Sequence, residues 1–259
     1  MFEALLKKSG TAQGPIPGYS GPGPQTLQGS YTDPANINKI AGFYGELAAA
    51  SFINATALAT ACGLTTGIVI NNTTAWLKFL LDGKILFVPK LPIRYNTSWQ
   101  DLYAKGVIYG DDTVGAFPFP STSPVNQNVR VTIGGLQYRV RLIRGSHADP
   151  GTRTTTDDDP GHIGSEWNRL IYPISVITKT PNNQIGPKFM ASPYAATALG
   201  FNSSTGSMTV CMETTDGTLT AVVVRGFASA TGSTYGNKAG MNDRGGWRPV
   251  LELINTAPP

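Results

Sequence analysis

Trp76-Leu77-Lys78-Phe79-Leu80-Leu81, then Asp82-Gly83, then Lys84-Ile85-Leu86-Phe87-Val88 is the stretch that decides the fold. Two runs of mostly aromatic and aliphatic residues flank a dipeptide that interrupts them. Asp-Gly accepts the positive φ angles of a type I′ turn, and the twist of this turn matches that of two paired strands. The stretch therefore predicts an antiparallel β-hairpin.

A second hairpin is predicted further along the chain. Val129–Ile133 and Leu136–Leu142 flank a Gly-Gly dipeptide, and apolar and polar residues alternate along both runs. Successive residues of a strand point to opposite faces of the sheet. The alternation therefore puts Arg130, Arg139 and Arg141 on the face opposite to the apolar side chains.

A third hairpin and the composition extend this prediction to the whole chain. Met208–Glu213 and Leu219–Arg225 are joined through Asp216-Gly217. Charged residues make up only 14% of the 259 residues, against about 25% in ordinary soluble domains. Gly, Pro, Thr, Ser and Asn take their place, and these residues suit turns and half-buried strands. We expect an α+β fold that is β-dominated, with antiparallel hairpins, a few short helices and long loops.

Three short helices are predicted beside the hairpins. Ala48–Cys62 carries apolar residues at roughly helical spacing. Ser98–Gly106 begins at an N-cap serine, has an acid three residues later, and ends at glycine. Ser165–Leu170 is the third, and within it Glu166 and Arg169 have the spacing of an i, i+3 pair.

The chain is expected to divide into an N-terminal region, 1–72, and a β-rich main domain, 73–259. Within the first region, 9–35 is rich in Gly and Pro and predicts an extended linker, and Ile40–Leu47 predicts a strand. The apolar residues Phe2, Leu5 and Leu6 either dock on a partner subunit or belong to a frayed terminus. Long loops, which are functional or contact a partner, are expected at 111–127, 146–164, 179–207 and 227–246.

Charge, targeting signals and cysteines argue against several classes of protein. The net charge is +4 with scattered basic residues, a pattern that does not predict a nucleic-acid interface. No apolar run reaches the ~20 residues of a membrane span, and Met1–Lys8 lacks the pattern of a signal peptide. We therefore expect the chain to be made and folded in the cytoplasm. Cys62 and Cys211 are interpreted as small buried apolar residues, with a disulfide between them left open.

Catalytic and metal-binding patterns are few. The chain contains two histidines and none of the nucleophile-elbow, Walker, HExxH or CxxC motifs. We therefore expect no enzyme activity and no cofactor. The densest chemical cluster is a loop with three successive acids, for which a Ca²⁺ or transition-metal site and a solvated loop are both open interpretations; its members are Asp157, Asp158 and Asp159, with His147, Asp149 and His162 nearby.

Aromatic residues within Gly- and Ser-rich segments are the candidates for contact with a ligand or partner. Exposed rings of this kind suit stacking on sugars or contact with proteins, whereas the alternative is that they pack beneath the loops. Both interpretations stay open for Phe117, Phe119, Tyr194, Phe201 and Tyr235.

Several separate stretches together resemble a family of virion proteins of tailed bacteriophages. The resemblance spreads over most of the chain and is strongest in the last two stretches. It implies a virion part, often tail-associated or fibre-like, and it supplies no catalytic residues. The stretches are Leu5–Gly10, Gly42–Glu46, Trp76–Phe79, Val88–Tyr95, Ser98-Trp99, Tyr138–Gly145, Gly164–Leu170 and Gly246–Leu253.

The last of these stretches, Trp247-Arg248-Pro249-Val250-Leu251-Glu252-Leu253, is also similar to the closing strand of C-type-lectin-like folds. That similarity implies a C-type-lectin-like main domain. Because proline cannot donate to a strand ladder, Pro249 predicts an edge strand, or a strand that starts after the proline. Trp247 is expected to close the core, with a ligand role for Trp247 or Arg248 as the alternative.

The sequence thus predicts a structural component of a tailed-phage virion, located in tail, collar, fibre or head. A receptor- or glycan-binding adhesion protein of a tail fibre or tip is the alternative, and a glycan depolymerase is a minor one. The expected partners are other virion proteins, copies of the same chain in a homo-oligomer and a host-surface glycan or protein. Neither nucleic acid nor membrane insertion is expected, and the expected location is the virion, assembled in the host cytoplasm.

Overall fold

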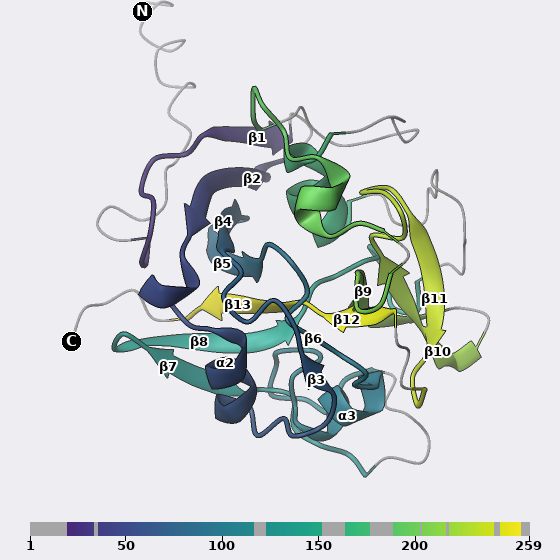
Figure 1. Ribbon diagram of the computed structural model, residues 1–259. Coiled ribbons are helices and arrows are strands. Elements are labelled where there is room, and N and C mark those ends of the chain that lie inside the picture. The colour runs from purple at the N-terminus through teal and green to yellow at the C-terminus, as the bar shows by residue number, and fades with distance from the viewer. Residues whose placement is uncertain are drawn as a thin grey trace, which may run out of the picture.

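The computed structural model describes residues 20–33, 36–116, 123–151, 164–176, 189–202, 204–215, 218–240 and 244–254, and these residues form two β-sheets with few short helices. The first sheet has seven strands, all paired antiparallel, in the order β1-β2-β4-β5-β13-β8-β7 (Figure 1). Its strands are β1 (Gly29–Asp33), β2 (Asn36–Leu47), β4 (Trp76–Leu81), β5 (Lys84–Pro89), β7 (Arg130–Ile133), β8 (Leu136–Leu142) and β13 (Pro249–Leu253).

The second sheet has six strands in the order β11-β10-β9-β12-β6-β3. All its pairs are antiparallel except the pair of β9 with β12. Its strands are β3 (Ile68–Val69), β6 (Arg94–Tyr95), β9 (Met208–Thr215), β10 (Thr218–Arg225), β11 (Ser233–Asn237) and β12 (Gly245–Trp247). The β-dominated class predicted from the sequence is confirmed.

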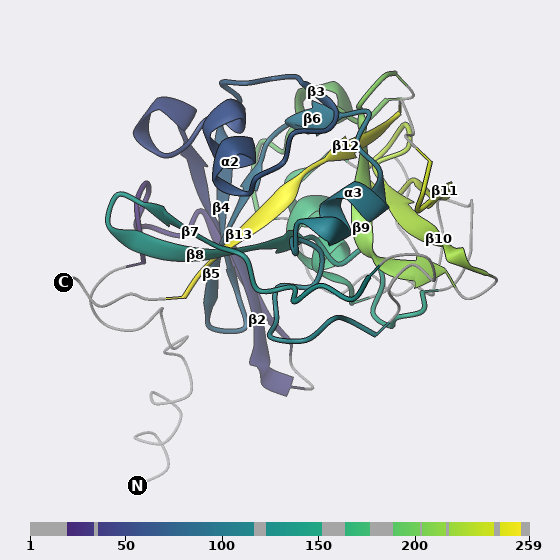
Figure 2. The same ribbon diagram turned by 90° about the horizontal axis from the view of Figure 1, so that it is seen from below.

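Two adjacent segments of the chain each connect one sheet to the other. β12 continues through Arg248 into β13, and Figure 2 shows the two as one yellow ribbon through the middle of the molecule. β5 leads in the same way into β6. Because β13 pairs with β5 and β12 pairs with β6, the two segments cross together, and the amide of Ile93 donates to the carbonyl of Trp247 at 2.9 Å between these pairs. The C-terminal motif therefore joins both sheets.

The predicted hairpins form as expected. β4 and β5 pair in register from Trp76↔Pro89 to Leu81↔Lys84, with φ of 48° at Asp82 and 82° at Gly83, as a type I′ turn requires. β7 pairs with β8, and β9 with β10. The turn residues 216–217 lie outside the described residues.

β4 and β5 are covered on both faces. Trp76, Leu80 and Phe87 belong to one core cluster, whereas Phe79 and Leu86 belong to another on the opposite face. A strand buried on both faces has a nearly continuous apolar sequence instead of an alternating one. This burial explains why the two strands of the first hairpin lack polar positions except Lys78 and, next to the turn, the exposed Lys84.

Lys78 is itself completely buried. Its ammonium group donates to the Ser20 hydroxyl at 3.0 Å and to the Pro24 carbonyl at 2.7 Å, and lies 4.9 Å from the centre of the Tyr44 ring. Burial lowers the pKa of Lys78 to about 8. The lysine thus holds residues 20–24 against the sheet.

The helices are short and form largely where predicted. The 48–62 segment divides into η1 (Ala49–Ser51) and α2 (Ala55–Ala61), because the Asn54 side chain caps the amide of Ala57 and starts a new helix. The third predicted helix begins at Glu166 and continues as the π-helical turn η3 (Trp167–Ile171), followed by the 3₁₀ turn η4 (Tyr172–Ile174). A further 3₁₀ turn, η5, spans Ala196–Leu199.

The helix α3 (Trp99–Ala104) has the predicted capping box. The Ser98 hydroxyl accepts from the Asp101 amide at 3.0 Å, and the Asp101 carboxylate accepts from the Ser98 amide at 2.9 Å. We expect Ser98→Ala to lower the free energy of unfolding by about 1 kcal/mol, because the Asp101 amide loses its acceptor. Urea denaturation measures this change. Thr60→Ala, at an exposed hydroxyl of α2, is the control, and equal losses in both variants would contradict the capping role.

Three predictions about strands are wrong. Residues 29–33, expected in a linker, form β1, and the next strand begins at Asn36 rather than Ile40. The expected loop 227–246 contains β11 and the first two residues of β12. Pro249 does not mark an edge strand, because β13 lies between β5 and β8. Proline is tolerated there because it is the first residue of the strand.

The boundary expected at residue 72 does not coincide with a break between sheets, since β2 pairs with β4 across it. Within the part of the chain that the structure describes, no helix has the length and apolar character needed to cross a bilayer.

Candidate functional site

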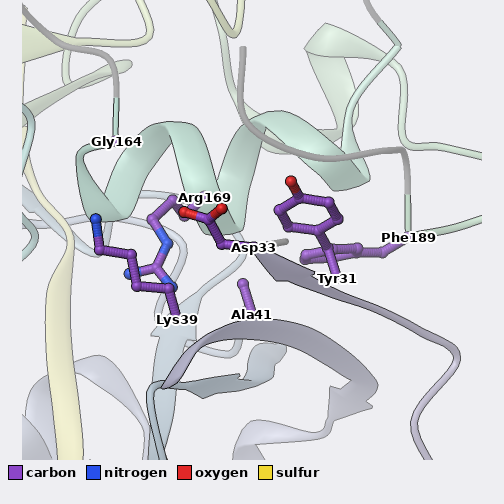
Figure 3. Close-up of a pocket in the computed structure, with 7 residues that line it drawn as sticks. All are labelled: Tyr31, Asp33, Lys39, Ala41, Gly164, Arg169 and Phe189. Carbon is purple, nitrogen blue, oxygen red and sulfur yellow. The ribbon is translucent and has the colours of Figure 1, made fainter. Parts of the chain in front are cut away.

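A hollow lies where β1 and β2 meet the helical turn η3. It contains about 380 Å³ of empty space, part of which is open to solvent. Figure 3 shows charged side chains at one end of the hollow, aromatic rings at the other, and the small Ala41 between them. The lining residues are Tyr31, Asp33, Lys39, Ala41, Gly164, Arg169 and Phe189.

Strand register brings the residues of β1 and β2 together. Tyr31 lies directly opposite Ala41 in the antiparallel pair, and Asp33 and Lys39 each lie two residues from these positions. Residues two apart in a strand share a face, although a register shift between Thr32 and Asp33 interrupts the ladder at this end. A methyl group at position 41 leaves space that a larger side chain would fill.

Arg169 closes the hollow from η3 and is fixed in place. Its two terminal nitrogens donate to the two carboxylate oxygens of Asp82 at 2.6 Å each. Asp82 also accepts from the Ile40 amide at 2.8 Å. The turn residue of the first hairpin therefore ties η3 to β2. Glu166 was expected to pair with Arg169, but it pairs with Arg141 instead.

The chemical character of the hollow follows from the charges, rings and hydrogen-bond acceptors of its lining residues. The charge of Arg169 is balanced by Asp82, whereas Lys39 is exposed at the charged end. Asp33 contributes acceptors, and Tyr31 is half-buried. Phe189 is 3% exposed and serves as a wall. Such a hollow suits a small ligand with one apolar face, hydroxyl groups and a negative charge.

The five aromatic candidates differ in how deeply they are buried. Phe201 is buried with its ring centre 5.4 Å from that of Trp167. Tyr194 donates to Glu46 at 2.5 Å beneath the ammonium of Lys90, and burial with the neighbouring Glu46 carboxylate raises its pKa. Both therefore pack within the fold. Tyr235 is 38% exposed on β11. Phe117 and Phe119 lie outside the described residues.

Most of the candidate metal ligands fall outside the part of the chain that the structure describes. Asp157, Asp158, Asp159 and His162 lie outside the described residues. Asp149 is half-buried and accepts from the Thr214 amide at 3.0 Å, and its pKa is raised by burial. Among the described residues, no group of three or more His, Cys, Asp or Glu side chains is arranged to hold a metal ion.

Cys62 and Cys211 are free and buried in different core clusters, as expected for small apolar residues. Burial raises the pKa of both thiols.

Glu213 is the buried acid with the largest consequence for pH dependence. It is 2% exposed and accepts from the Gly145 amide at 2.9 Å. Burial raises its pKa to about 8, which outweighs the lowering effects of that amide and of Arg144; the nearby Asp149 raises it further. Between its ordinary pKa and about 8, the folded chain therefore holds a proton that the unfolded chain has lost.

Glu213 thus stabilises the fold fully below its ordinary pKa, and this contribution is lost as pH rises through about 8. We expect Glu213→Gln, which stays neutral, to remove this loss and to be more stable than the wild type near pH 8. Urea midpoints between about pH 5 and 8 measure it. An unchanged slope of stability against pH would show that Glu213 does not titrate in this range.

Arg141 is at the centre of a buried ionic cluster formed with Glu166 and Glu252. Its terminal nitrogens donate to both Glu166 oxygens at 2.7 Å, and its Nε donates to Glu252 at 3.2 Å. Burial alone would lower the pKa of Arg141, but the two carboxylates raise it. Arg141, on the arginine-bearing face of the second hairpin, therefore forms ion pairs within the fold.

Arg248 and Trp247 are buried in the crossing between the sheets. The Nη2 of Arg248 donates to the carbonyl oxygens of Lys90, at 3.0 Å, and Leu199. Its guanidinium carbon lies 5.4 Å from the Phe201 ring centre, and burial lowers its pKa. At 1% exposure, Trp247 occupies the core as predicted, and neither residue lines the hollow.

Sequence reasoning missed Tyr31, Asp33, Lys39 and Phe189. The alternation Ser30-Tyr31-Thr32-Asp33 was the available signal, but it is short and follows a Gly- and Pro-rich segment. In comparisons with known proteins, no family model, no curated protein and no solved structure matches the chain.

Proposed function

We propose that the chain is a structural component of a tailed-phage virion that displays a binding surface on the particle. The observation that supports this proposal most is that the separate stretches carrying the resemblance contact one another. Such contacts would be retained if the resemblance reflects a common scaffold.

The first group of contacts joins three stretches. The ammonium of Lys78, in Trp76–Phe79, lies over the ring of Tyr44, in Gly42–Glu46. Glu46 pairs with Lys90, in Val88–Tyr95, at 2.7 Å. These contacts hold neighbouring strands of the seven-stranded sheet together.

The second group joins the remaining large stretches to these. Arg141, in Tyr138–Gly145, pairs with Glu166, in Gly164–Leu170, and with Glu252, in Gly246–Leu253. Arg248 then donates to the carbonyl of Lys90, which links this group to the first. These six stretches thus form one connected scaffold, and the role proposed for them is structural rather than catalytic.

A C-type-lectin-like topology of the main domain is part of the proposal. Two mostly antiparallel sheets linked by the crossing of β12 and β13 are compatible with it. An experimental structure that allows strand-by-strand comparison would test it.

Receptor or glycan binding at a fibre or tip is the second candidate function, and the hollow beside η3 favours it. Binding by rings and charges on paired strands needs no catalytic group. A glycan depolymerase would need two positioned acids that reach the substrate, whereas one of the seven residues that line the hollow is an acid, Asp33. Release of sugars from host envelope material, lost in Asp158→Asn, would be the result expected of a depolymerase.

The test of the virion role is location. Purified particles of the phage that encodes the chain should contain it at a fixed copy number, by quantitative mass spectrometry and by labelling with an antibody against the purified chain. A cryo-EM map should place both sheets at a symmetric position in the particle. Absence of the chain from particles purified through a density gradient would overturn the proposal.

A further inference from the structure

We propose that the hollow beside η3 binds a single pyranose residue that carries a carboxylate, such as a uronic acid unit of a bacterial surface polysaccharide. This inference rests on the proposed display of the chain on a particle. The lining of the hollow indicates the ligand class in three steps: an apolar face, a negative charge and a limited size.

The apolar face corresponds to the aromatic end of the hollow. Tyr31 is half-buried and Phe189 almost wholly buried, so the Tyr31 ring is held by packing while part of it still faces solvent. A pyranose ring has an apolar C–H face that stacks on such a ring. The small Ala41, opposite Tyr31 in the strand pair, leaves the space beside the ring open.

The negative charge corresponds to Lys39. Arg169 also lines the hollow, but both of its terminal nitrogens are bound by Asp82. Lys39 is exposed, and Figure 3 shows its ammonium at the charged end, away from the rings. A carboxylate on the sugar would pair with this ammonium. The Asp33 carboxylate, between the two ends, would accept hydrogen bonds from ring hydroxyls.

The size limits the ligand to about one sugar residue. The empty space of about 380 Å³ includes open solvent, so the enclosed part of the hollow is smaller than this value. A longer glycan would therefore place one acidic residue in the hollow and extend along the surface.

The experiment is a titration of the full chain with methyl glucuronide and with methyl glucoside, followed by calorimetry and by saturation-transfer NMR. We expect the acidic sugar to bind up to about fivefold more tightly than the neutral one, the effect of one added ion pair at an exposed ammonium. Lys39→Met should bring the two affinities together. Tyr31→Leu should weaken binding of both sugars.

Matched controls are available on the same chain. Lys105→Met removes a lysine next to α3, and Tyr235→Ala removes the exposed ring on β11; neither should change either affinity. Thermal melts of each variant show whether it folds. The exposed Lys39 carries the test if Tyr31→Leu is unstable.

No binding of either sugar at millimolar concentration, or an unchanged preference for the acidic sugar in folded Lys39→Met, overturns the inference. Its failure is distinguishable from that of the virion role. A chain that is present in particles but binds no sugar leaves the virion role standing. A chain that binds the acidic sugar but is absent from particles supports the hollow and removes the virion role.

Discussion

Glu166→Gln is expected to lower the free energy of unfolding by about 3–5 kcal/mol, because it leaves the buried Arg141 without its bidentate partner. Glu166 accepts from both terminal nitrogens of Arg141 at 2.7 Å and from the Arg144 amide at 3.0 Å. The side chain of Arg141 is 6% exposed, so water cannot replace the lost carboxylate. Urea denaturation near neutral pH measures the loss.

Two further variants test whether the loss of stability comes from the burial of the charge or simply from a broken ion pair. Glu46→Gln breaks the ion pair with Lys90, in which the lysine side chain is 23% exposed and the glutamate side chain 33% exposed. This substitution should lower the free energy of unfolding by no more than about 1 kcal/mol. Arg141→Met combined with Glu166→Met should cost less than Glu166→Gln alone, since the buried guanidinium is removed together with its bidentate partner and Glu252 keeps Lys84 at 3.0 Å. Equal losses for Glu166→Gln and Glu46→Gln would contradict the argument.

Gly246→Ala is expected to cost about 3 kcal/mol or more, and to reduce the yield of folded protein. A Cβ atom at position 246 would lie 2.4 Å from the Gly206 carbonyl oxygen, 2.5 Å from the Pro92 Cβ and 2.9 Å from the Met208 carbonyl oxygen. Two of these atoms are backbone and cannot rotate away, so β12 has to move from its neighbours β9 and β6.

Gly240→Ala is the matched control for this substitution. A Cβ atom there would meet the Asn237 Cβ at 3.3 Å, a contact that a small shift relieves. Thermal unfolding of both variants and of the wild type measures the difference. A Gly246→Ala protein with the melting temperature of the Gly240→Ala protein would show that the crossing between the sheets is not tightly packed.

The sequence alone predicted those elements whose turns, caps or alternating patterns involve residues close together in the chain. The Asp82-Gly83 turn, the capping box of Ser98 and the alternation of 136–142 each depend on residues close in sequence. β1 and β11 were missed because edge strands with Gly, Ser and Thr have weak propensities and form through pairing with a neighbour. The position of Pro249 was misjudged because its neighbours on both sides come from distant parts of the chain.

The candidate site could not be predicted for a related reason. Asp82 and Arg169 are 87 residues apart, and their pairing fixes the wall of the hollow. Tyr31 and Phe189 line the same hollow because the backbone of Phe189 lies beside Gly29, the first residue of β1. Phe201 and Tyr194, the residues that composition favoured, pack against the scaffold instead.

The crossing of β12 and β13 also constrains the order of folding. Arg248 contacts Lys90 across 158 residues of chain, and β13 separates β5 from β8 in the finished sheet. Until residues 249–253 leave the ribosome, β5 and β8 each present an unpaired edge. Such edges are prone to self-association, and pairing over this distance is slow. The chain should therefore depend on chaperones during synthesis and gain most of its cooperativity only when β13 is inserted between β5 and β8.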